Sequence, residues 1–174
     1  IHEKKMKKDY TNGTTEGRPL EIIKTEEEWI QADFALWKIR RQIDRKSAAR
    51  YAFYYFNGEN YSNEIRKYGS GNRRTIQFPM KKSCEEQFAE DLKIIAQEKI
   101  SWLIAPPSII FTLCCVAIKY GIQVKINVIE SISEYLPQFY KKLFELVFSG
   151  RVYIHYSCHE VWGMGFSGED GVLH

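Results

Sequence analysis

The sequence predicts an α/β fold, with a mainly parallel sheet and helices on both of its faces. From residue 83 onward, segments with helical spacing alternate with short apolar runs, in the order helix, strand, helix, strand, helix, strand. Helices of this length between strands favour right-handed crossover connections. The 174 residues, 44% hydrophobic and 27% charged, are typical of a soluble globular domain.

The first half of the chain contains one clear helix and one short strand. Thr25 with Glu28 forms a capping box, which predicts a helix that ends near Asp44. Its inward positions are Trp29, Ala32, Leu36, Ile39 and Ile43. The aromatic run 51–56 predicts a buried strand, and residues 60–74, with two glycines and few aliphatic residues, predict a loop.

The second half is more regular. Ser83 with Glu86 predicts a second capping box, and the apolar run 101–105 predicts a strand. Ser108 can cap a helix through Tyr120. Gly121 follows at the position where a helix C-terminus favours positive φ.

Two further strands and one helix complete the predicted pattern. The β-branched run 124–129 predicts a strand, and residues 137–148 predict a helix that Gly150 closes. Residues 151–156 predict the last strand. We expect the strands that end at Ala105, Ile129 and His155 to be neighbours in one sheet.

Composition excludes several classes of protein. A net charge of +3 is too small to indicate a nucleic-acid partner, and the apolar run 109–118 is too short to span a membrane. The adjacent Cys114 and Cys115 do not resemble a disulfide framework, which favours a reducing, cytoplasmic setting. The chain lacks an initiator Met, so we expect it to be a piece of a longer protein.

The segment 11–19 contains groups that bind phosphate. Gly13 and Gly17 let backbone N–H groups approach an anion, Thr14 and Thr15 add hydroxyl donors, and Arg18 adds charge. It is not a P-loop, because no Lys follows the second Gly. The alternative interpretation of this segment is a solvated surface turn.

Polar residues also follow the predicted strands, where parallel sheets bind ligands. They are Pro106-Pro107-Ser108, residues 130–134 and residues 156–160. Glu130 and Glu134 could orient a base or a sugar, or Glu134 could cap or line the helix that begins near Pro137. Neither alternative is excluded by the sequence.

The last of these segments offers two metal chemistries. A carboxylate just after a strand, here Glu160, suits Mg²⁺ on a triphosphate. The alternative is zinc on His155, Cys158 and His159, with His174 as a further ligand, although this spacing fits no common zinc signature and His155 should face away from Tyr156.

These segments, taken in order, resemble the adenylate-forming (ANL) ligases. The closest branch contains phenylacetate–CoA ligase, coenzyme F390 synthetase and the capsular polysaccharide CapK-type proteins. Thr11 to Leu20 resembles the [ST]SG[ST]TGxP phosphate loop, and the helix start Thr25-Glu-Glu-Glu-Trp29 is also typical. The other matching segments are Trp102 to Ser108 ("PS"), Ser133-Glu134-Tyr135-Leu136 ("GE-x-L"), Val152 to Glu160 ("YG-x-[ST]-E") and Gly168 to His174 ("EC…GLH").

The resemblance implies roles for individual residues. Thr14 and Glu160 would be catalytic, with Glu160 the Mg²⁺ ligand. The nucleotide-binding residues would be Thr11, Gly13, Thr14, Thr15, Gly17, Ser133, Glu134 and Tyr156, with Tyr156 stacked on adenine. We expect these groups to converge on one cleft at the carboxyl edge of the sheet.

The sequence departs from the family pattern at several positions. Glu16 adds one residue to the phosphate loop, Ser133 and Ser157 replace glycines, and His159 replaces Thr or Ser. The family would continue past His174 with a ribose-binding aspartate and a C-terminal lid that carries a lysine. We therefore interpret residues 1–174 as a single partial domain without that lid, with a phosphate loop at 11–20, a helix at 25–44 and α/β units at 83–160.

The resemblance implies ATP-dependent activation of a small carboxylic acid through an acyl-adenylate. ATP and Mg²⁺ would be the cofactors, and CoA would be one acceptor of the activated acyl group. The enzyme would act as an acyl- or aryl-CoA ligase or in capsular polysaccharide biosynthesis. This piece by itself is expected to be inactive, and a homodimer is a further expectation. The alternative is a non-catalytic nucleotide-binding or scaffold relative of the same fold, which Glu16 and the missing lid favour. A nucleic-acid module using Lys4 to Lys8 and Arg73-Arg74 has little support from the charge.

Overall fold

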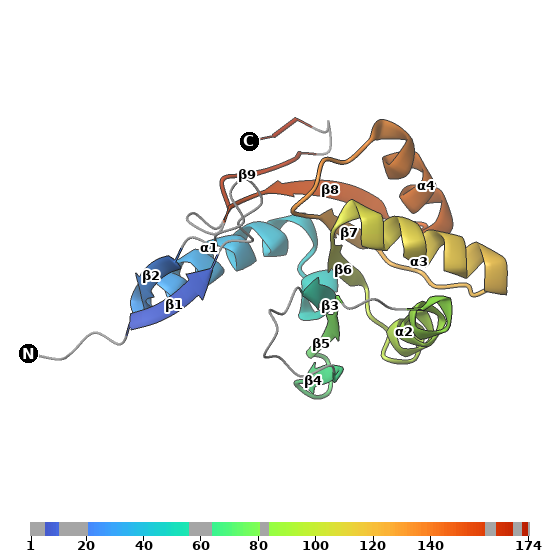
Figure 1. Ribbon diagram of the computed structural model, residues 1–174, viewed down its shortest axis with the longest axis horizontal. Coiled ribbons are helices and arrows are strands. Elements are labelled where there is room, and N and C mark those ends of the chain that lie inside the picture. Colours follow the sequence, from blue (N-terminus) through green and yellow to red (C-terminus); the bar gives the residue numbers. More distant parts are fainter. Residues whose placement is uncertain are drawn as a thin grey trace, which may run out of the picture.

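The computed structural model describes residues 6–10, 21–55, 64–80, 84–158, 163–168 and 172–173. Its centre is a seven-stranded sheet in the order β4-β5-β3-β6-β7-β8-β9, with helices on both faces (Figure 1). This arrangement confirms the predicted fold class. Among the described residues, no helix combines the length and the apolarity that crossing a bilayer requires.

The elements alternate along most of the chain. The strands are β1 Met6–Tyr10, β2 Glu21–Thr25, β3 Arg50–Tyr55, β4 Arg66–Tyr68, β5 Arg74–Pro79, β6 Trp102–Ala105, β7 Val128–Ser131, β8 Arg151–Tyr156 and β9 Gly165–Phe166. The helices are α1 Glu26–Asp44, the short 3-10 helix η1 Ser47–Ala49, α2 Glu85–Gln97, α3 Pro107–Tyr120 and α4 Gln138–Phe148.

The five inner strands of the sheet are parallel. β3 pairs with both β5 and β6, β6 pairs with β7, and β7 pairs with β8. Only the edge strands β4 and β9 run antiparallel to their neighbours. The prediction that the strands ending near residues 105, 129 and 155 are neighbours is therefore confirmed.

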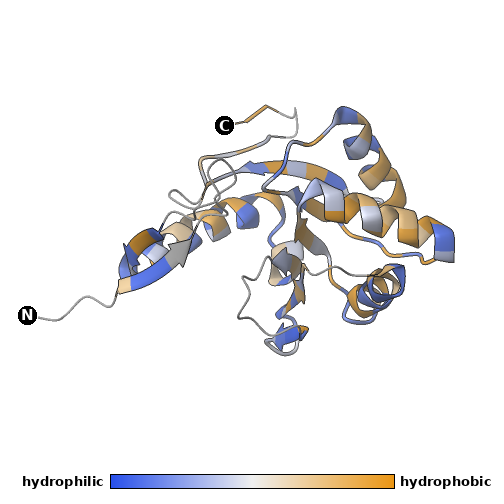
Figure 2. Ribbon diagram, in the orientation of Figure 1, coloured by the Kyte–Doolittle hydropathy of each residue, from blue (hydrophilic) through white to orange (hydrophobic). Residues whose placement is uncertain are grey.

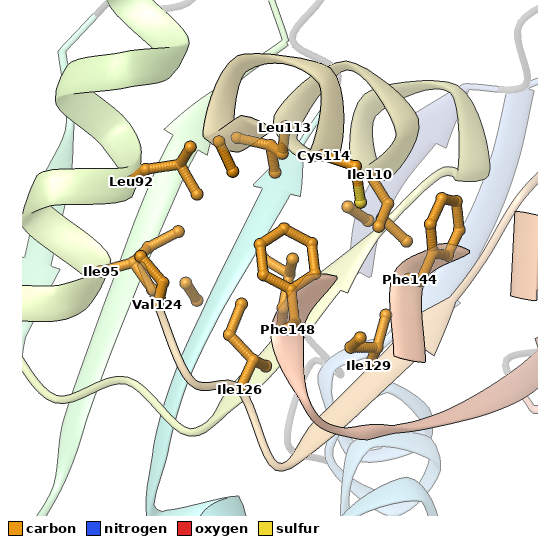
Figure 3. Packing of buried hydrophobic residues seen from close by; sticks show 14 of the residues in the cluster. Leu92, Ile95, Ile110, Leu113, Cys114, Val124, Ile126, Ile129, Phe144 and Phe148 are labelled. Atoms are coloured by element: carbon orange, nitrogen blue, oxygen red, sulfur yellow. The ribbon is translucent and has the colours of Figure 1, made fainter. Parts of the chain in front are cut away.

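One face of the sheet is covered by α2, α3 and α4. Their apolar side chains meet those of the strands in one cluster, which Figure 3 shows with Leu92 and Ile95 from α2, Leu113 from α3, and Phe144 and Phe148 from α4. Figure 2 shows that α3 is apolar along most of its length. This is expected for a helix that packs on the sheet and has α2 on one side and α4 on the other. Burial of this surface supplies most of the driving force for folding.

The opposite face is covered by α1. A second, smaller cluster there contains Trp102, Ile104 and Tyr153 from the strands, packed against Trp37 and Ile39 of α1. α1 begins where the capping box predicts, since the Thr25 hydroxyl accepts from the Glu28 N–H and the Glu28 carboxylate accepts from the Thr25 N–H. It ends at Asp44, as predicted.

The N-terminal ends of two helices differ from the prediction by one or two residues, whereas the C-terminal end of α3 agrees with it. The N-cap of α2 is Cys84 and not Ser83, which lies outside the described residues. The N-cap of α3 is Pro106, so Ser108 lies inside the first turn of the helix. Proline suits both positions, since Pro106 takes an extended conformation at the N-cap and Pro107 occupies the first helical position. Gly121 takes positive φ as predicted.

The end of α4 corrects another prediction. Ser149, with φ 53°, takes the left-handed conformation assigned to Gly150. Gly150 is needed for another reason: a Cβ there would lie 1.8 Å from the Ile126 carbonyl oxygen. The glycine permits close approach of two backbones.

The predicted strand at 124–129 is wrong over its first four residues. Strand β7 covers Val128–Ser131, where the neighbouring β6 offers hydrogen-bonding partners. Val124 and Ile126 are buried in the larger cluster, but the Ile126 N–H donates to the Phe148 carbonyl. Their β-branched side chains therefore reflect burial and not strand pairing.

Five of the described strands lie where none was predicted, among them the short edge strand β9. β4 and β5 form a hairpin inside and just after the predicted 60–74 loop, with Gly69 and Gly71 at positive φ between them. β1 and β2 pair antiparallel as a separate two-stranded sheet. In Figure 1 the two-stranded sheet of β1 and β2 projects from the rest of the molecule, together with the beginning of α1.

Candidate functional site

The carboxyl ends of β6, β7 and β8 form one continuous edge. Ala105 at the end of β6 is in register with Ser131 at the end of β7, and Ser131 is in register with Ile154 of β8. The three polar segments singled out in the sequence begin at this edge. Ligands of parallel α/β sheets bind at such edges.

Glu134 joins two of these segments. Its carboxylate accepts hydrogen bonds from the Ser108 N–H at 3.0 Å and the Ser108 hydroxyl at 2.9 Å. The negative charge therefore lies at the N-terminus of α3, where the helix dipole stabilises it. Of the predicted alternatives, capping is the one observed, but the capped helix is α3 and not α4.

The turn before Glu134 contains a residue in an unusual conformation. Ser133 has φ 66°, in the left-handed region that favours glycine. In the family pattern that position is the glycine of "GE-x-L". The backbone thus keeps the glycine conformation although the side chain is serine.

Consecutive residues of β8 point to opposite faces. Tyr156 is 56% exposed, whereas His155 is buried on the α1 face against Phe166, with the ring centroids 5.4 Å apart. The prediction that His155 faces away from Tyr156 is confirmed. Tyr156 is open to a planar ligand at the carboxyl edge.

Beneath the edge lies a buried polar network that the sequence analysis did not predict. Glu130 is fully buried, and its carboxylate accepts two hydrogen bonds from the Arg40 guanidinium, at 2.9 and 2.7 Å. It also accepts from the Trp102 indole N–H at 2.9 Å. The His155 Nδ1 lies 2.8 Å from the same carboxylate. Glu130 is therefore unavailable to a base or a sugar.

The charges in this network stabilise one another. Burial acts to raise the pKa of Glu130, but the Arg40 charge and the His155 hydrogen bond outweigh it and lower the pKa to about 2. Burial acts to lower the pKa of Arg40, but the Glu130 carboxylate outweighs it and holds that pKa above its ordinary value. Both groups remain ionised as a pair, as buried charges require.

Arg40 carried a signal in the sequence that was not used. It follows Leu36 by four residues and therefore lies on the inward face of α1. An arginine at an inward helical position predicts a buried acidic partner. Its partner Glu130 could be found only once β7 was placed against α1.

Within the part of the chain that the structure describes, three buried polar atoms near the carboxyl ends of the strands have no hydrogen-bond partner. They are the Tyr55 hydroxyl at the end of β3, the Ser131 hydroxyl at the end of β7 and the His155 Nε2 near the end of β8. Buried polar groups are nearly always paired with protein or water, so each of these three atoms has room in its hydrogen bonding for a water molecule or a polar ligand.

Many of the predicted site residues lie outside the described residues. They are Thr11, Gly13, Thr14, Thr15, Gly17 and Glu160. Strands β1 and β2 flank segment 11–20, with Tyr10 in register with Glu21. The convergence of Thr14 and Glu160 on one cleft therefore stays a prediction.

The zinc alternative has no support among the described residues. In that part of the chain no group of three His, Cys, Asp or Glu side chains is arranged to hold a metal ion. His155 is engaged with Glu130 on the α1 face, and the Cys158 thiol lies 3.6 Å from the Met164 sulfur. His159, like Glu160, lies outside the described residues.

No family model and no curated protein matches the chain in sequence. Solved structures match its fold. A crystal structure of 2-hydroxyisobutyryl-CoA ligase in the postadenylation state, in complex with R3-HIB-AMP, has a TM-score of 0.69 at 16% identity, over 94% of this chain and 35% of that chain. The open conformation of the same ligase, in complex with 2-HIB-AMP and CoA, has a TM-score of 0.66 at 15% identity, over 95% of this chain and 39% of that chain.

The luciferase-like enzyme from the nonluminescent mealworm Zophobas morio is also similar. Its TM-score is 0.61 at 15% identity, over 92% of this chain and 36% of that chain. The chain therefore has the fold of part of an adenylate-forming enzyme domain. It spans between a third and two fifths of the length of these three structures.

Proposed function

We propose that this chain is part of an enzyme that activates a carboxylic acid with ATP, forming an acyl-adenylate and pyrophosphate. One observation carries the proposal: the Ser108 and Glu134 segments are joined, beside β8 and Tyr156, at the carboxyl edge of a sheet whose structural neighbours include CoA ligases. The left-handed Ser133 supports the resemblance at one of its substituted positions.

In this proposal each segment has a physical task. The backbone N–H groups and hydroxyls of segment 11–20 bind the β and γ phosphates, which is positioning and charge stabilisation. Tyr156 stacks on adenine, and its exposed ring suits that role. Glu134 holds the adenine-side turn through Ser108, so it acts as a positioning residue.

ATP and Mg²⁺ are the proposed cofactors, and CoA is a proposed acceptor. The described residues contain no carboxylate cluster for a divalent cation. The proposed Mg²⁺ ligand is Glu160, which follows the described Cys158 by two residues. Magnesium would lower the cost of charge that develops on the transferring phosphates.

The finer assignments are proposals as well. They are the branch of phenylacetate–CoA ligase, coenzyme F390 synthetase and CapK-type proteins, the cytoplasmic location and the homodimer. The second candidate function is a nucleotide-binding or scaffold protein without turnover. Glu16 favours it, since an acidic residue in a phosphate loop repels a triphosphate.

Acid-dependent exchange of pyrophosphate into ATP tests the proposal, together with Mg-ATP binding. The natural full-length protein should exchange, Thr14→Ala and Glu160→Gln should slow exchange roughly a hundredfold or more, and the exposed Glu90→Gln on α2 should not. Mg-ATP binding without exchange by any acid would favour the scaffold function. Absence of Mg-ATP binding would contradict both functions.

A further inference from the structure

The edge of the sheet opposite the candidate site is strongly basic. Five segments meet at this edge, because each leads into the amino-terminal end of a parallel strand: 44–50, 67–74, 97–101, 121–127 and 149–151. We call them together the basic edge. Its only acidic residues are Asp44 and Glu98, whereas its basic residues are Arg45, Lys46, Arg50, Lys67, Arg73, Arg74, Lys99, Lys125 and Arg151. The whole chain has a formal charge of only +3, so the rest of the sequence is net acidic.

Arg50 fixes part of the basic edge through neutral groups. Its guanidinium donates to three backbone carbonyls, one of them in the β4–β5 turn and the other two just before β6. They belong to Gly71 at 2.7 Å, Lys99 at 3.2 Å and Glu98. Carbonyl oxygens satisfy the N–H groups of the arginine without removing its positive charge.

Further hydrogen bonds join the remaining segments. The Asn127 side-chain amide donates to the Ser47 hydroxyl at 3.0 Å, and the Arg151 N–H donates to the Asn127 carbonyl at 2.9 Å. The Ser101 hydroxyl lies 3.4 Å from the Ser47 carbonyl, to which it donates. The five segments therefore form one continuous surface that is held in place by its own backbone.

Both acidic residues of the basic edge are already engaged. The Glu98 carboxylate pairs with the Lys67 ammonium at 2.9 Å and with the Arg74 guanidinium at 3.1 Å. The Asp44 carboxylate accepts from the Ser47 hydroxyl at 2.7 Å and from the N–H groups of residues 46 and 47. Neither carboxylate compensates the other cations of this edge.

Five cations of the basic edge are exposed, and the part of the chain that the structure describes offers them no ion pair: Arg45, Lys46, Arg73, Lys99 and Lys125. They spread in two directions. Along the sheet, the segments of Arg73 and Lys125 lead into β5 and β7, which are roughly 14 Å apart with β3 and β6 between them. Across the sheet, Lys46 follows α1 on one face, and Lys125 follows α3 on the other. The cations therefore cover an area and do not follow a line.

This surface contains almost no apolar group. Tyr68 is the one large hydrophobic side chain that is exposed in the five segments. A protein interface has an apolar or aromatic centre, and a single-stranded nucleic acid needs aromatic side chains on which its bases stack. A duplex presents its phosphates along strands that border a groove. A lipid surface with anionic headgroups requires only cations spread over an area.

We infer that the basic edge docks on the anionic surface of a lipid bilayer. The carboxyl edge lies at the other end of the strands, so the candidate site faces away from the lipid. Little ordering accompanies this contact, because the backbone that carries the cations is already fixed. The inference goes beyond the proposed function and does not depend on it.

Sedimentation of the natural full-length protein with vesicles tests the inference. One set of vesicles contains phosphatidylcholine alone, and the other contains about 30% phosphatidylserine as well. The protein should bind the second set and not the first. It should be released when the salt concentration is raised from about 0.1 M to about 0.5 M, because salt screens the attraction between exposed charges.

A triple variant measures the contribution of the basic edge. Each Lys or Arg near an anionic lipid surface increases binding roughly fivefold. Lys46→Gln, Arg73→Gln and Lys125→Gln together should therefore weaken binding to the phosphatidylserine vesicles on the order of a hundredfold. All three side chains are exposed, so the melting temperature should stay close to that of the wild type.

A second triple variant removes the same charge elsewhere. Lys38→Gln, Lys93→Gln and Lys142→Gln change exposed residues of α1, α2 and α4. This control should bind the vesicles nearly as tightly as the wild type. Hydrogen exchange of the wild type gives an independent readout, since vesicles should slow exchange in 67–74 and 121–127 and leave 132–136 unchanged.

Three results would overturn the inference. They are equal binding to both sets of vesicles, equal losses in the two triple variants, and tighter binding to duplex RNA, duplex DNA or polyglutamate than to vesicles at the same concentration of negative charge. If the first triple variant does not fold, the lipid preference and the hydrogen exchange of the wild type still decide. None of these measurements requires acid-dependent pyrophosphate exchange, so failure of the proposed function is seen separately.

Discussion

At the scale of single residues, the Glu130 network is the most constrained part of the molecule. Its four side chains come from α1, β6, β7 and β8, so they hold the helix against three adjacent strands. Each partner of Glu130 compensates part of the cost of burying its charge. Removing one partner leaves the rest of that cost in place.

We predict that Arg40→Met destabilises the protein by about 3–5 kcal/mol, since it leaves the Glu130 charge buried without its cation. The next residue provides a matched control. Arg41 is exposed on the same helix, and Arg41→Met should change the free energy of unfolding by less than about 0.5 kcal/mol. Urea unfolding at neutral pH measures both values. Equal effects of the two substitutions would contradict the network's role.

Single residues were the hardest feature to predict from the sequence. The opposite orientations of Tyr156 and His155 followed from strand alternation, because that rule is local. For Glu130 the sequence left a ligand-facing role open, yet the residue is buried against Arg40, ninety positions away in the chain. No local pattern connects those two residues.

At the scale of elements, the contact between Glu134 and Ser108 fixes the loop after β7 to the first turn of α3. The carboxylate accepts from a free N–H group at the N-terminus of the helix, which is where an acidic group is most useful. The contact also sets the position of the turn that contains Ser133.

We predict that Glu134→Ala destabilises the protein by about 1 kcal/mol, as loss of a helix cap does, and that Ser108→Ala destabilises it less, because the Ser108 backbone N–H still donates to Glu134. The double variant should be little worse than Glu134→Ala alone, because that substitution already removes the hydrogen bond from the Ser108 hydroxyl. Chemical denaturation of the three variants and the wild type completes the cycle. Strictly additive effects would show that the two residues do not stabilise the fold through each other.

The sequence predicted elements better than it predicted their ends. The capping box of α1 was correct because both partners lie within one helical turn. The strand at 124–129 was wrong because β-branched side chains report burial as well as pairing. β5 was missed although Ile76 and Phe78 alternate with less buried neighbours, which is a usable strand signal.

At the scale of the whole molecule, the alternation of helices and strands predicted the parallel core β6-β7-β8, because crossover connections have a preferred hand and bring successive strands together. It did not predict β4, β5 and β9, or that β3 lies between β5 and β6. The location of the candidate site, the carboxyl edge, was predicted from topology alone, whereas the roles of its individual residues came only from the resemblance. Its finer chemistry depends on contacts between distant residues and on segments outside the described ones.

The same topology predicts how stability is distributed. β6 lies between β3 and β7, and all four of its residues are buried, so its amides should exchange hydrogen only through global unfolding. β1 and β2 form a separate two-stranded sheet, an arrangement that is marginal by itself, and their amides should exchange fastest among the strands.

Mg-ATP should change this order in a specific way if segment 11–20 binds phosphate. The two strands that flank the segment would then exchange more slowly, by up to about a hundredfold when Mg-ATP is at about 100 times its Kd. Hydrogen exchange of the full-length protein, followed by mass spectrometry with Mg²⁺ alone and with Mg-ATP, measures the effect. Thr14→Ala should remove the protection of β1 and β2 without changing the exchange of β6 in Mg²⁺ alone. Protection that spares β1 and β2 while other strands slow would place the nucleotide away from segment 11–20, and that segment would then be a surface turn.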